Sequence, residues 1–207
     1  IEALPSDFRA TPPPEPNPPR PLAPSRPAAV PPPARSPLEA DGASTFLRGR
    51  LVHRLLELLP EAAADSRAEA ARRFLARPVH GLDEQAQAEI AAEVMGVLSE
   101  PAAQPLFGPN SQAEVPLAAV LGKHVISGQV DRLVVEDDRV LVVDYKSGRA
   151  APQDESAVPD AYMAQMANYR AVLRAIFPGR EIHCALLFTD GPSLLWLPDS
   201  HMDVYAP

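Results

Sequence analysis

Leucines recur at helical spacing in the first strongly apolar part of the chain, and this pattern predicts a helix over residues 44–59. Its apolar stripe consists of Leu47, Leu51, Leu55 and Leu58, widened by Val52, Leu56 and Leu59. Ser44 or Thr45 can cap its start, and Pro60 ends it. Two alanine-rich helices are expected next, near 61–76 and 83–98. The second has Asp83 as its cap and an inner face of Ile90, Val94 and Val97.

The hydrophobic period changes from helical to two at about residue 112. Alternating segments predict strands at 112–120, 124–136, 139–146, 182–189 and 193–197. One helix, 160–177, interrupts the strands, with Asp160 as its cap and Pro178–Gly179 as its stop. Its apolar stripe consists of Tyr162, Met166, Tyr169, Leu173 and Ile176. Helices followed by strands around one helix indicate a mixed α/β domain.

Proline sets the first 40 residues apart, because 13 of the chain's 26 prolines lie between Pro12 and Pro37. This stretch has too few aliphatic residues to offset its chain entropy by burial. We expect residues 1–40 to be a semi-rigid linker with extended polyproline conformations, and residues 41–207 to be the folded domain. A ligand for a proline-binding groove is the alternative interpretation of the same stretch.

Charge and cysteine content narrow the class of protein. The net charge of −8 argues against a general DNA-coating protein, but not against an enzyme that binds phosphates through a metal and a local basic patch. The single cysteine, Cys184, excludes a disulfide and an iron–sulfur cluster held by four cysteines, and fits a reducing cytoplasm.

Targeting and nucleotide-binding signals are missing from the sequence. No apolar run approaches the ~20 residues of a membrane span, so no membrane partner is expected. A phosphate-binding loop of the G-x-x-x-x-G-K-[S/T] type is also missing, so ATP hydrolysis would need another part of the polypeptide. Because the chain starts at Ile1 rather than Met, we expect a fragment of a longer protein.

Two aspartates on neighbouring predicted strands are the first candidate site. Asp144 and Lys146 form D-x-K at the end of an apolar strand and point to one face, whereas Tyr145 points to the other. A hairpin centred on Asp137–Asp138 places Asp131 directly opposite Asp144, with Cβ atoms ~4.5–5.5 Å apart. Opposed carboxylates repel, and a divalent cation such as Mg²⁺ or Mn²⁺ removes the conflict. The alternatives are a hairpin slipped by one residue and an ordinary salt bridge between Asp131 and Lys146.

Three further polar residues lie on or beside apolar helix faces. Gln165 sits within the stripe of the 160–177 helix, and Tyr169 is its i+4 neighbour, so the amide and the phenol can act together. A satisfied core pair is the alternative. His53 lies beside the stripe of the first helix, where Gly49 leaves room over the imidazole. A lone histidine at such an edge is more often structural than a ligand.

Four segments together resemble the nuclease domain of the AddA/RecB-type helicase–nuclease family, within the PD-(D/E)XK superfamily. They are R-G-R-L-V-H-R-L-L-E-L-L-P (48–60), G-Q-V-D-R-L (128–133), V-D-Y-K-S-G (143–148) and A-Y-x-x-Q-M-x-x-Y (161–169). The resemblance covers about residues 40–197, and the single cysteine separates this chain from relatives that carry a four-cysteine cluster. It implies a restriction-endonuclease-like fold: a mixed central sheet flanked by helices, with an N-terminal helical layer.

The same resemblance implies the site and the activity. The metal ligands would be His53, Asp131, Asp144 and the Tyr145 backbone carbonyl, with Glu114 as a further acid. Lys146 would be the catalytic lysine, and Gln165 and Tyr169 the conserved motif behind it. The implied activity is Mg²⁺-dependent exonucleolytic cleavage of DNA, with Mn²⁺ as a substitute. A non-catalytic DNA-end-binding or subunit-docking module on the same fold is the alternative function.

The resemblance also implies a cellular setting. The substrate would be the 3′-terminated DNA strand fed by the helicase portion of the same polypeptide, with an AddB-type subunit as partner. The process would be double-strand break repair by homologous recombination in the bacterial cytoplasm, at the nucleoid.

Overall fold

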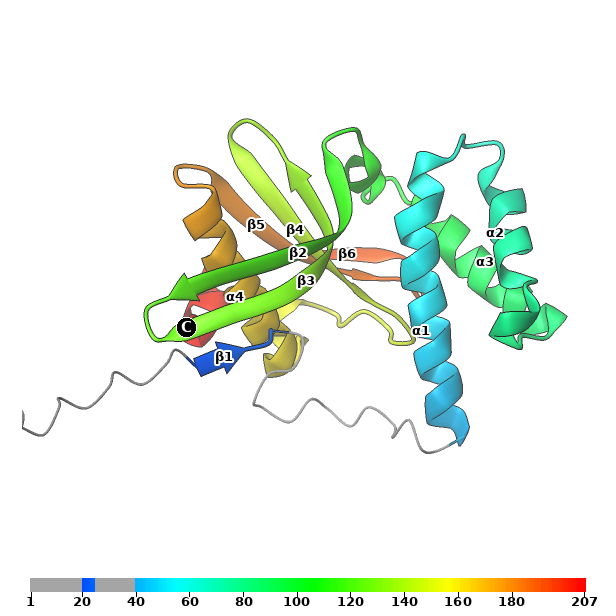
Figure 1. Ribbon diagram of the computed structural model, residues 1–207, viewed down its shortest axis with the longest axis horizontal. Helices are drawn as coiled ribbons and strands as arrows, with labels where there is room; N and C mark the ends of the chain where they lie inside the picture. The colour runs from blue at the N-terminus through cyan, green and yellow to red at the C-terminus, as the bar shows by residue number, and fades with distance from the viewer. Residues whose placement is uncertain (1–19, 25–39) are drawn as a thin grey trace, which may run out of the picture.

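A computed structural model of the 207-residue chain describes residues 20–24 and 40–207. A mixed six-stranded sheet lies between two helical layers (Figure 1). The strands are β1 (Arg20–Leu22), β2 (Ser111–Leu121), β3 (His124–Val135), β4 (Arg139–Lys146), β5 (Glu181–Phe188) and β6 (Ser193–Leu197). The α-helices are α1 (Ala40–Leu58), α2 (Arg67–Leu75), α3 (Glu84–Ser99), α4 (Asp160–Ile176) and α5 (Asp199–Met202). The predicted fold class is therefore confirmed.

Short 3-10 turns join these elements. They are η2 (Leu59–Glu61), η3 (Pro78–His80), η4 (Gln104–Phe107), η5 (Glu155–Ala157) and η6 (Asp203–Tyr205). Among the described residues, no helix is both long and apolar enough to cross a membrane.

The sheet has the order β1-β3-β4-β5-β6, and β2 pairs with β3 along its other edge. β3 is the longest-paired strand: β2 runs antiparallel to nearly all of it, from Leu121↔His124 to Ser111↔Val134. On the opposite edge, β1 pairs with 124–126 and β4 with 132–135. β5 lies parallel to β4, with α4 as the connection between them, and β6 is the outer antiparallel strand.

Side-chain alternation along β4 divides the core into two clusters. Leu141 and Val143 face the layer of α1, α2 and α3, whereas Val140 and Val142 face α4. All four side chains are buried, so β4 is an interior strand covered on both faces. This burial explains why its sequence reads as a continuous apolar run ending in polar residues.

The predicted strands agree with the observed ones to within one residue at each end, but two helix starts and one predicted helix cap differ. α1 begins at Ala40, so Ser44 and Thr45 lie inside the helix rather than at its start. α4 starts at Asp160 as predicted, but Asp160 is its first residue rather than its cap, and its carboxylate accepts a hydrogen bond from the Tyr205 hydroxyl at 2.6 Å. The expected 61–76 helix is shorter, since Arg67 donates to carbonyls before it and holds a non-helical turn.

The prediction that Leu58 and Ile176 belong to buried apolar stripes is also wrong, because both side chains are exposed at the ends of their helices. The expectations for α3 are confirmed. Asp83 accepts from the Ala86 backbone N–H at 2.8 Å, and the predicted inner face of that helix is buried.

Part of the proline-rich segment belongs to the sheet. Arg20–Leu22 form β1, and Pro24 is buried, near enough that a Cβ on Gly128 would lie 3.2 Å from its Cδ. Residues 20–24 thus differ from the expectation of a linker that contributes nothing to the domain. Residues 1–19 and 25–39 lie outside the described residues, so the division of the chain at residue 40 stays a prediction.

Candidate metal-dependent active site

The β3–β4 hairpin brings the two predicted aspartates together. Its register pairs Arg132 with Val143 and Leu133 with Val142, which is the register that the turn at Asp137–Asp138 predicts. Asp131 and Asp144 lie one position beyond the last of these pairs. There, Asp131 Oδ2 accepts a hydrogen bond from the Tyr145 backbone N–H at 2.6 Å, so the carboxylate takes the place of the next backbone bond.

His53 reaches this hairpin end from helix α1. Its Nδ1 lies 3.1 Å from Asp131 Oδ1, and its ring packs edge-on against Tyr145 with centroids 5.4 Å apart. His53, Glu114 and Asp131 each offer one ligand atom, and these atoms all lie within 4.8 Å of one another. One imidazole and two carboxylates therefore converge from α1, β2 and β3, which is a donor set suited to a divalent cation such as Mn²⁺ or Mg²⁺.

Asp144 takes part in a different, neighbouring group. Its Oδ2 forms an ion pair with Lys146 Nζ at 2.7 Å, and its Oδ1 accepts from Gln165 Nε2 at 2.8 Å. Lys146 Nζ donates to Gln165 Oε1 at 2.9 Å, so each of the three side chains contacts the other two. Lys146 is therefore paired with Asp144 along its own strand, rather than with Asp131 across the hairpin.

A chain of hydrogen bonds connects this group to Glu114. The Tyr169 hydroxyl lies 3.5 Å from Gln165 Nε2 and donates to the Gln129 backbone carbonyl at 2.8 Å. The Gln129 side chain donates in turn to Glu114 Oε2 at 2.8 Å. Glu114 has a φ of +52°, the only left-handed non-glycine backbone among residues 20–24 and 40–207. Such a backbone is rarely adopted by a glutamate inside a strand and is typical of functional positions.

Burial and like charge perturb the acids of the site. Burial raises the pKa of Glu114, and the nearby charge of Asp131 raises it further. Burial also raises the pKa of Asp144, against the opposing effect of Lys146. For His53, burial lowers the pKa, but its hydrogen bond with Asp131 and the surrounding negative charges raise it more in total. Carboxylates that repel one another in a partly dry site are the situation that a bound cation relieves.

Two residues that sequence reasoning did not single out support the site. Arg132 is buried and donates to the Tyr145 hydroxyl at 2.9 Å and to the Leu56 carbonyl at 2.5 Å. It thereby ties the end of α1 to the hairpin that carries Asp131. Gln129 links Tyr169 to Glu114, as described above. Both lie within the G-Q-V-D-R-L segment, but their partners are distant in the sequence, so no local pattern marks them.

Gly49 has a different role from the one expected. A Cβ at this position would lie 2.8 Å from Ser147 Oγ, so the glycine makes room for the loop after β4 rather than for the His53 ring. α1 can therefore lie close to the end of β4. The Tyr145 side chain points to the opposite face from Asp144 and Lys146, as predicted, and packs against the layer of α1, α2 and α3. A ligand role for its backbone carbonyl stays a prediction.

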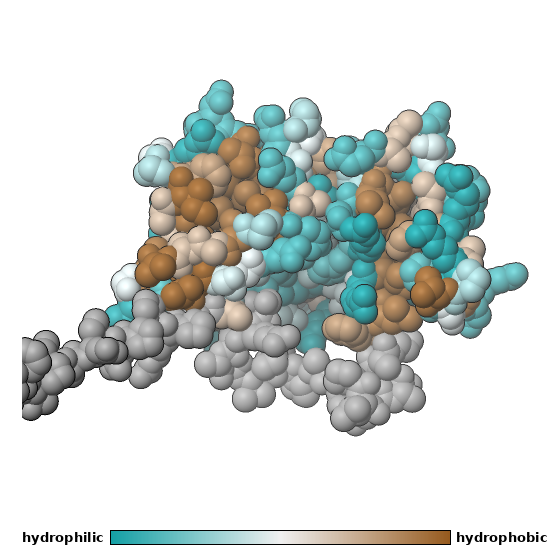
Figure 2. Space-filling model, viewed as in Figure 1, coloured by the Kyte–Doolittle hydropathy of each residue, from teal (hydrophilic) through white to brown (hydrophobic). Residues whose placement is uncertain are grey.

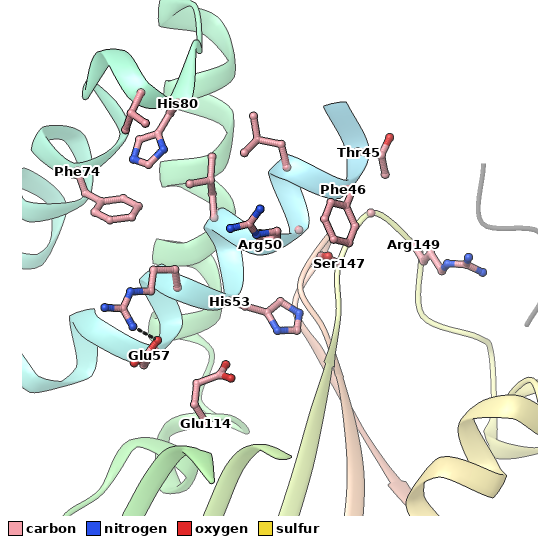
Figure 3. Close-up of a pocket in the computed structure, with 16 residues that line it drawn as sticks. Thr45, Phe46, Arg50, His53, Glu57, Phe74, His80, Glu114, Ser147 and Arg149 are labelled. Carbon is pink, nitrogen blue, oxygen red and sulfur yellow. Dashed lines mark hydrogen bonds and ion pairs between the residues drawn. The ribbon is translucent and has the colours of Figure 1, made fainter. Parts of the chain in front are cut away.

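A cleft of about 1380 Å³ lies at one side of this site, and Asp131, Asp144 and Lys146 are not among the residues that line it. His53 and Glu114 lie in its wall, together with Phe46 and Arg50 of α1 and Arg149 of the loop after β4 (Figure 3). On the surface, hydrophilic residues separate hydrophobic patches on the sheet side from those on the helical side (Figure 2). A polymer with a charged backbone could therefore reach His53 and Glu114 through this cleft.

Carboxylates, an imidazole and a lysine at the end of a buried hairpin, beside an open cleft, are typical of a metal-dependent nuclease. The family described as the PD-(D/E)XK nuclease superfamily matches residues 30–200, and the chain belongs to that superfamily.

Two solved structures resemble the chain weakly. One is SSO0001, with a TM-score of 0.35 and 15% identity over 79% of this chain and 82% of that one. The other is protein VC1899 from Vibrio cholerae, with a TM-score of 0.30 and 12% identity over 78% of this chain and 53% of that one. No curated protein matches the chain. The family assignment therefore depends on the superfamily match.

Proposed function

We propose that this chain is a Mg²⁺-dependent DNA exonuclease domain that hydrolyses phosphodiester bonds. One observation carries the proposal: His53, Glu114 and Asp131 offer ligand atoms within 4.8 Å of one another, directly beside the paired Asp144 and Lys146. The superfamily match supports it independently.

The residues fit a divalent cation by their chemistry. His53 supplies a nitrogen donor, Glu114 and Asp131 supply carboxylate oxygens, and we propose Asp144 and the Tyr145 carbonyl as further ligands. When bound, Mg²⁺ or Mn²⁺ supplies a Lewis acid that polarises a phosphate oxygen and lowers the pKa of water. Burial raises the pKa of Glu114 and the negative charge of Asp131 raises it further, and a bound cation would offset both effects.

Lys146 is the residue that we assign to the reacting phosphate. Its ammonium is held by Asp144 and Gln165, and it lies 3.8 Å from the centroid of the Tyr162 ring. These contacts fix the position of the flexible lysine side chain. The Lys146 ammonium can therefore orient a water molecule and stabilise negative charge on the phosphate without first moving. Gln165 and Tyr169 then act as positioning residues, because they hold Asp144 and the β3 backbone.

Calorimetric titration with Mn²⁺, together with cleavage of end-labelled DNA, tests the proposal. We expect Asp131→Ala/Asp144→Ala to lose Mn²⁺ binding and cleavage while its melting temperature shows that the domain is still folded. Glu181→Gln is a matched control, because this exposed carboxylate lies at the opposite end of β5. Undiminished Mn²⁺ binding in the double variant would refute the metal site. Mn²⁺ and DNA binding without cleavage by the unmodified protein would favour a non-catalytic DNA-end-binding module instead.

The cellular role is a finer part of the proposal. We infer an AddA/RecB-type nuclease domain that works with the helicase portion of its own polypeptide and an AddB-type subunit in recombinational repair, in the cytoplasm. The order of four sequence segments and the proline-rich residues 1–40 support this inference. Substrates labelled separately at each end test the expected polarity: degradation of the 3′-terminated strand agrees with it, and selective loss of the other strand contradicts it.

A further inference from the structure

Phe46 is an exposed aromatic residue on the cleft-facing side of α1. Its side chain is 62% exposed, although α1 buries most of its leucines against the sheet. It lies seven residues before His53, which is two helical turns, so both residues project from the same face of the helix. The cleft wall therefore carries an uncovered apolar ring in line with the candidate metal ligand.

Two arginines flank this ring. The Arg50 guanidinium lies 5.9 Å from the Phe46 ring centroid, and Figure 3 shows Arg149 on the other side of Phe46, on the loop after β4. Within the described part of the chain, neither arginine forms an ion pair with an acid, whereas Arg48 and Arg54 on the same helix do. In a chain with a net charge of −8, the described residues leave these two cations beside the cleft without an acidic partner.

An exposed aromatic ring flanked by two arginines matches the chemistry of a single nucleic-acid strand. Arginines bind phosphates, and a phenylalanine ring stacks on a base whose face is free. Bases inside a duplex cover one another's faces, so the ring cannot reach them there. We propose that Phe46, Arg50 and Arg149 bind an unpaired DNA strand in the cleft, with Phe46 stacked on one of its bases. This inference rests on the proposed nuclease function.

The position of the ring relates the stacked base to the cleavage site. Seven helical residues span about 10 Å along the axis of α1. The base on Phe46 would therefore lie a short distance along the strand from the phosphate beside His53 and Asp131. Arg50, one turn from each of Phe46 and His53, would contact the phosphates between them. The contact thus favours DNA strands whose bases are unpaired near the phosphodiester bond that is cut.

Fluorescence anisotropy with a labelled oligothymidylate tests this contact on the full 207-residue chain, in EDTA so that no cleavage occurs. We expect Phe46→Ala to weaken binding between about five-fold and 100-fold, the effect of losing one base–aromatic stack. Phe46→Trp should bind as the unmodified protein does. Val79→Ala is the matched control, because Val79 is 83% exposed in the same cleft but has no ring, and we expect less than a two-fold change.

Substrate variants separate stacking from general contact. A series of oligonucleotides, each with an abasic site at a different position, locates the stacked base. The unmodified protein should bind one member of the series more weakly than the rest. Phe46→Ala should bind that member as it binds the others. A blunt duplex should bind both proteins equally. Unchanged oligothymidylate binding by Phe46→Ala, no binding by the unmodified protein, or an equal loss with duplex would overturn the proposal.

The two proposals fail in different assays. If the unmodified protein binds an unpaired strand through Phe46 but does not cleave DNA with Mg²⁺ or Mn²⁺, the strand contact stands and the nuclease function fails. If metal-dependent cleavage occurs and Phe46→Ala binds as the unmodified protein does, only the strand contact fails.

Discussion

Replacement of Arg132 by methionine is the most informative stability experiment on this structure. The guanidinium is 2% exposed and donates to the Tyr145 hydroxyl and the Leu56 carbonyl. Leu56 lies in the last turn of α1, where carbonyls have no partner within the helix, and no basic residue of α1 itself lies there. Arg132 therefore supplies both the missing donor and a cation at the negative end of the helix dipole.

The magnitude follows mainly from the Tyr145 hydroxyl and the Leu56 carbonyl, because the third acceptor, Ser111 Oγ, lies 3.4 Å from the guanidinium and contributes less. Each buried group left without a partner costs about 1–3 kcal/mol. Removal of the buried cation also removes its own desolvation cost, which offsets part of that loss. We therefore expect Arg132→Met to lower the unfolding free energy by about 2–4 kcal/mol, measured by urea denaturation with an unchanged m-value.

A double-mutant cycle with Tyr145→Phe isolates one of the contacts. Tyr145→Phe removes the hydroxyl that Arg132 binds, so Arg132→Met should cost about 1–2 kcal/mol less in that background than in the unmodified protein. Leu56 keeps its unpaired carbonyl in both backgrounds and does not enter the difference. Strict additivity of the two substitutions, or a loss below about 1 kcal/mol for Arg132→Met alone, would show that this account of the buried guanidinium is wrong.

Two further predictions concern the packing and the pH dependence of the fold. An added methyl at Gly128 would lie 3.0 Å from Tyr169 Cε1, so Gly128→Ala should cost about 1–3 kcal/mol in thermal unfolding; Gly108→Ala, whose methyl would meet only a backbone oxygen at 3.8 Å, should be nearly neutral. Burial raises the pKa of Asp199, but the hydrogen bond from Arg170 and the nearby arginine charges lower it more in total. A lowered folded-state pKa contributes stability that is present above the unfolded value of 3.8 and is lost as pH falls through the folded value. The stability advantage of the unmodified protein over Asp199→Asn should therefore shrink on acidification, and a constant difference down to about pH 2 would contradict this assignment.

The strands and their register could be predicted because they depend on local alternation. β4 has a buried residue at nearly every position and ends in polar residues, and the turn at Asp137–Asp138 fixes its partner on β3. Asp131 and Asp144 could therefore be placed at the same end of the hairpin from sequence alone. Helix starts were less predictable: α1 begins at Ala40 rather than at residue 44, and α2 begins only at Arg67, whose side chain donates to the carbonyls of Pro60 and Ala62.

The connections that hold the candidate site could not be predicted in the same way. Arg132 contacts Leu56 across 76 residues, and no periodic pattern relates the two positions. The pairing of Asp144 with Lys146 and Gln165, rather than with Asp131 alone, depends on where α4 packs on the sheet. The left-handed backbone of Glu114 likewise has no signal in its neighbouring residues. The local sequence pattern therefore predicted the strands and the apolar helix faces, whereas tertiary packing determined which side chains form hydrogen bonds and ion pairs in the site.

The short pairing of β1 with β3 has a consequence for any shortened form of the protein. A chain that began at Asp41, where composition alone divides linker from domain, would lose Arg20–Leu22 and Pro24. The backbone N–H and C=O groups of residues 124–126 would then lack partners on that edge of β3, and an open edge is a template for a strand from another molecule. Such a truncated protein should self-associate as its concentration rises, whereas a chain that retains residue 20 onward keeps this edge closed to its neighbours.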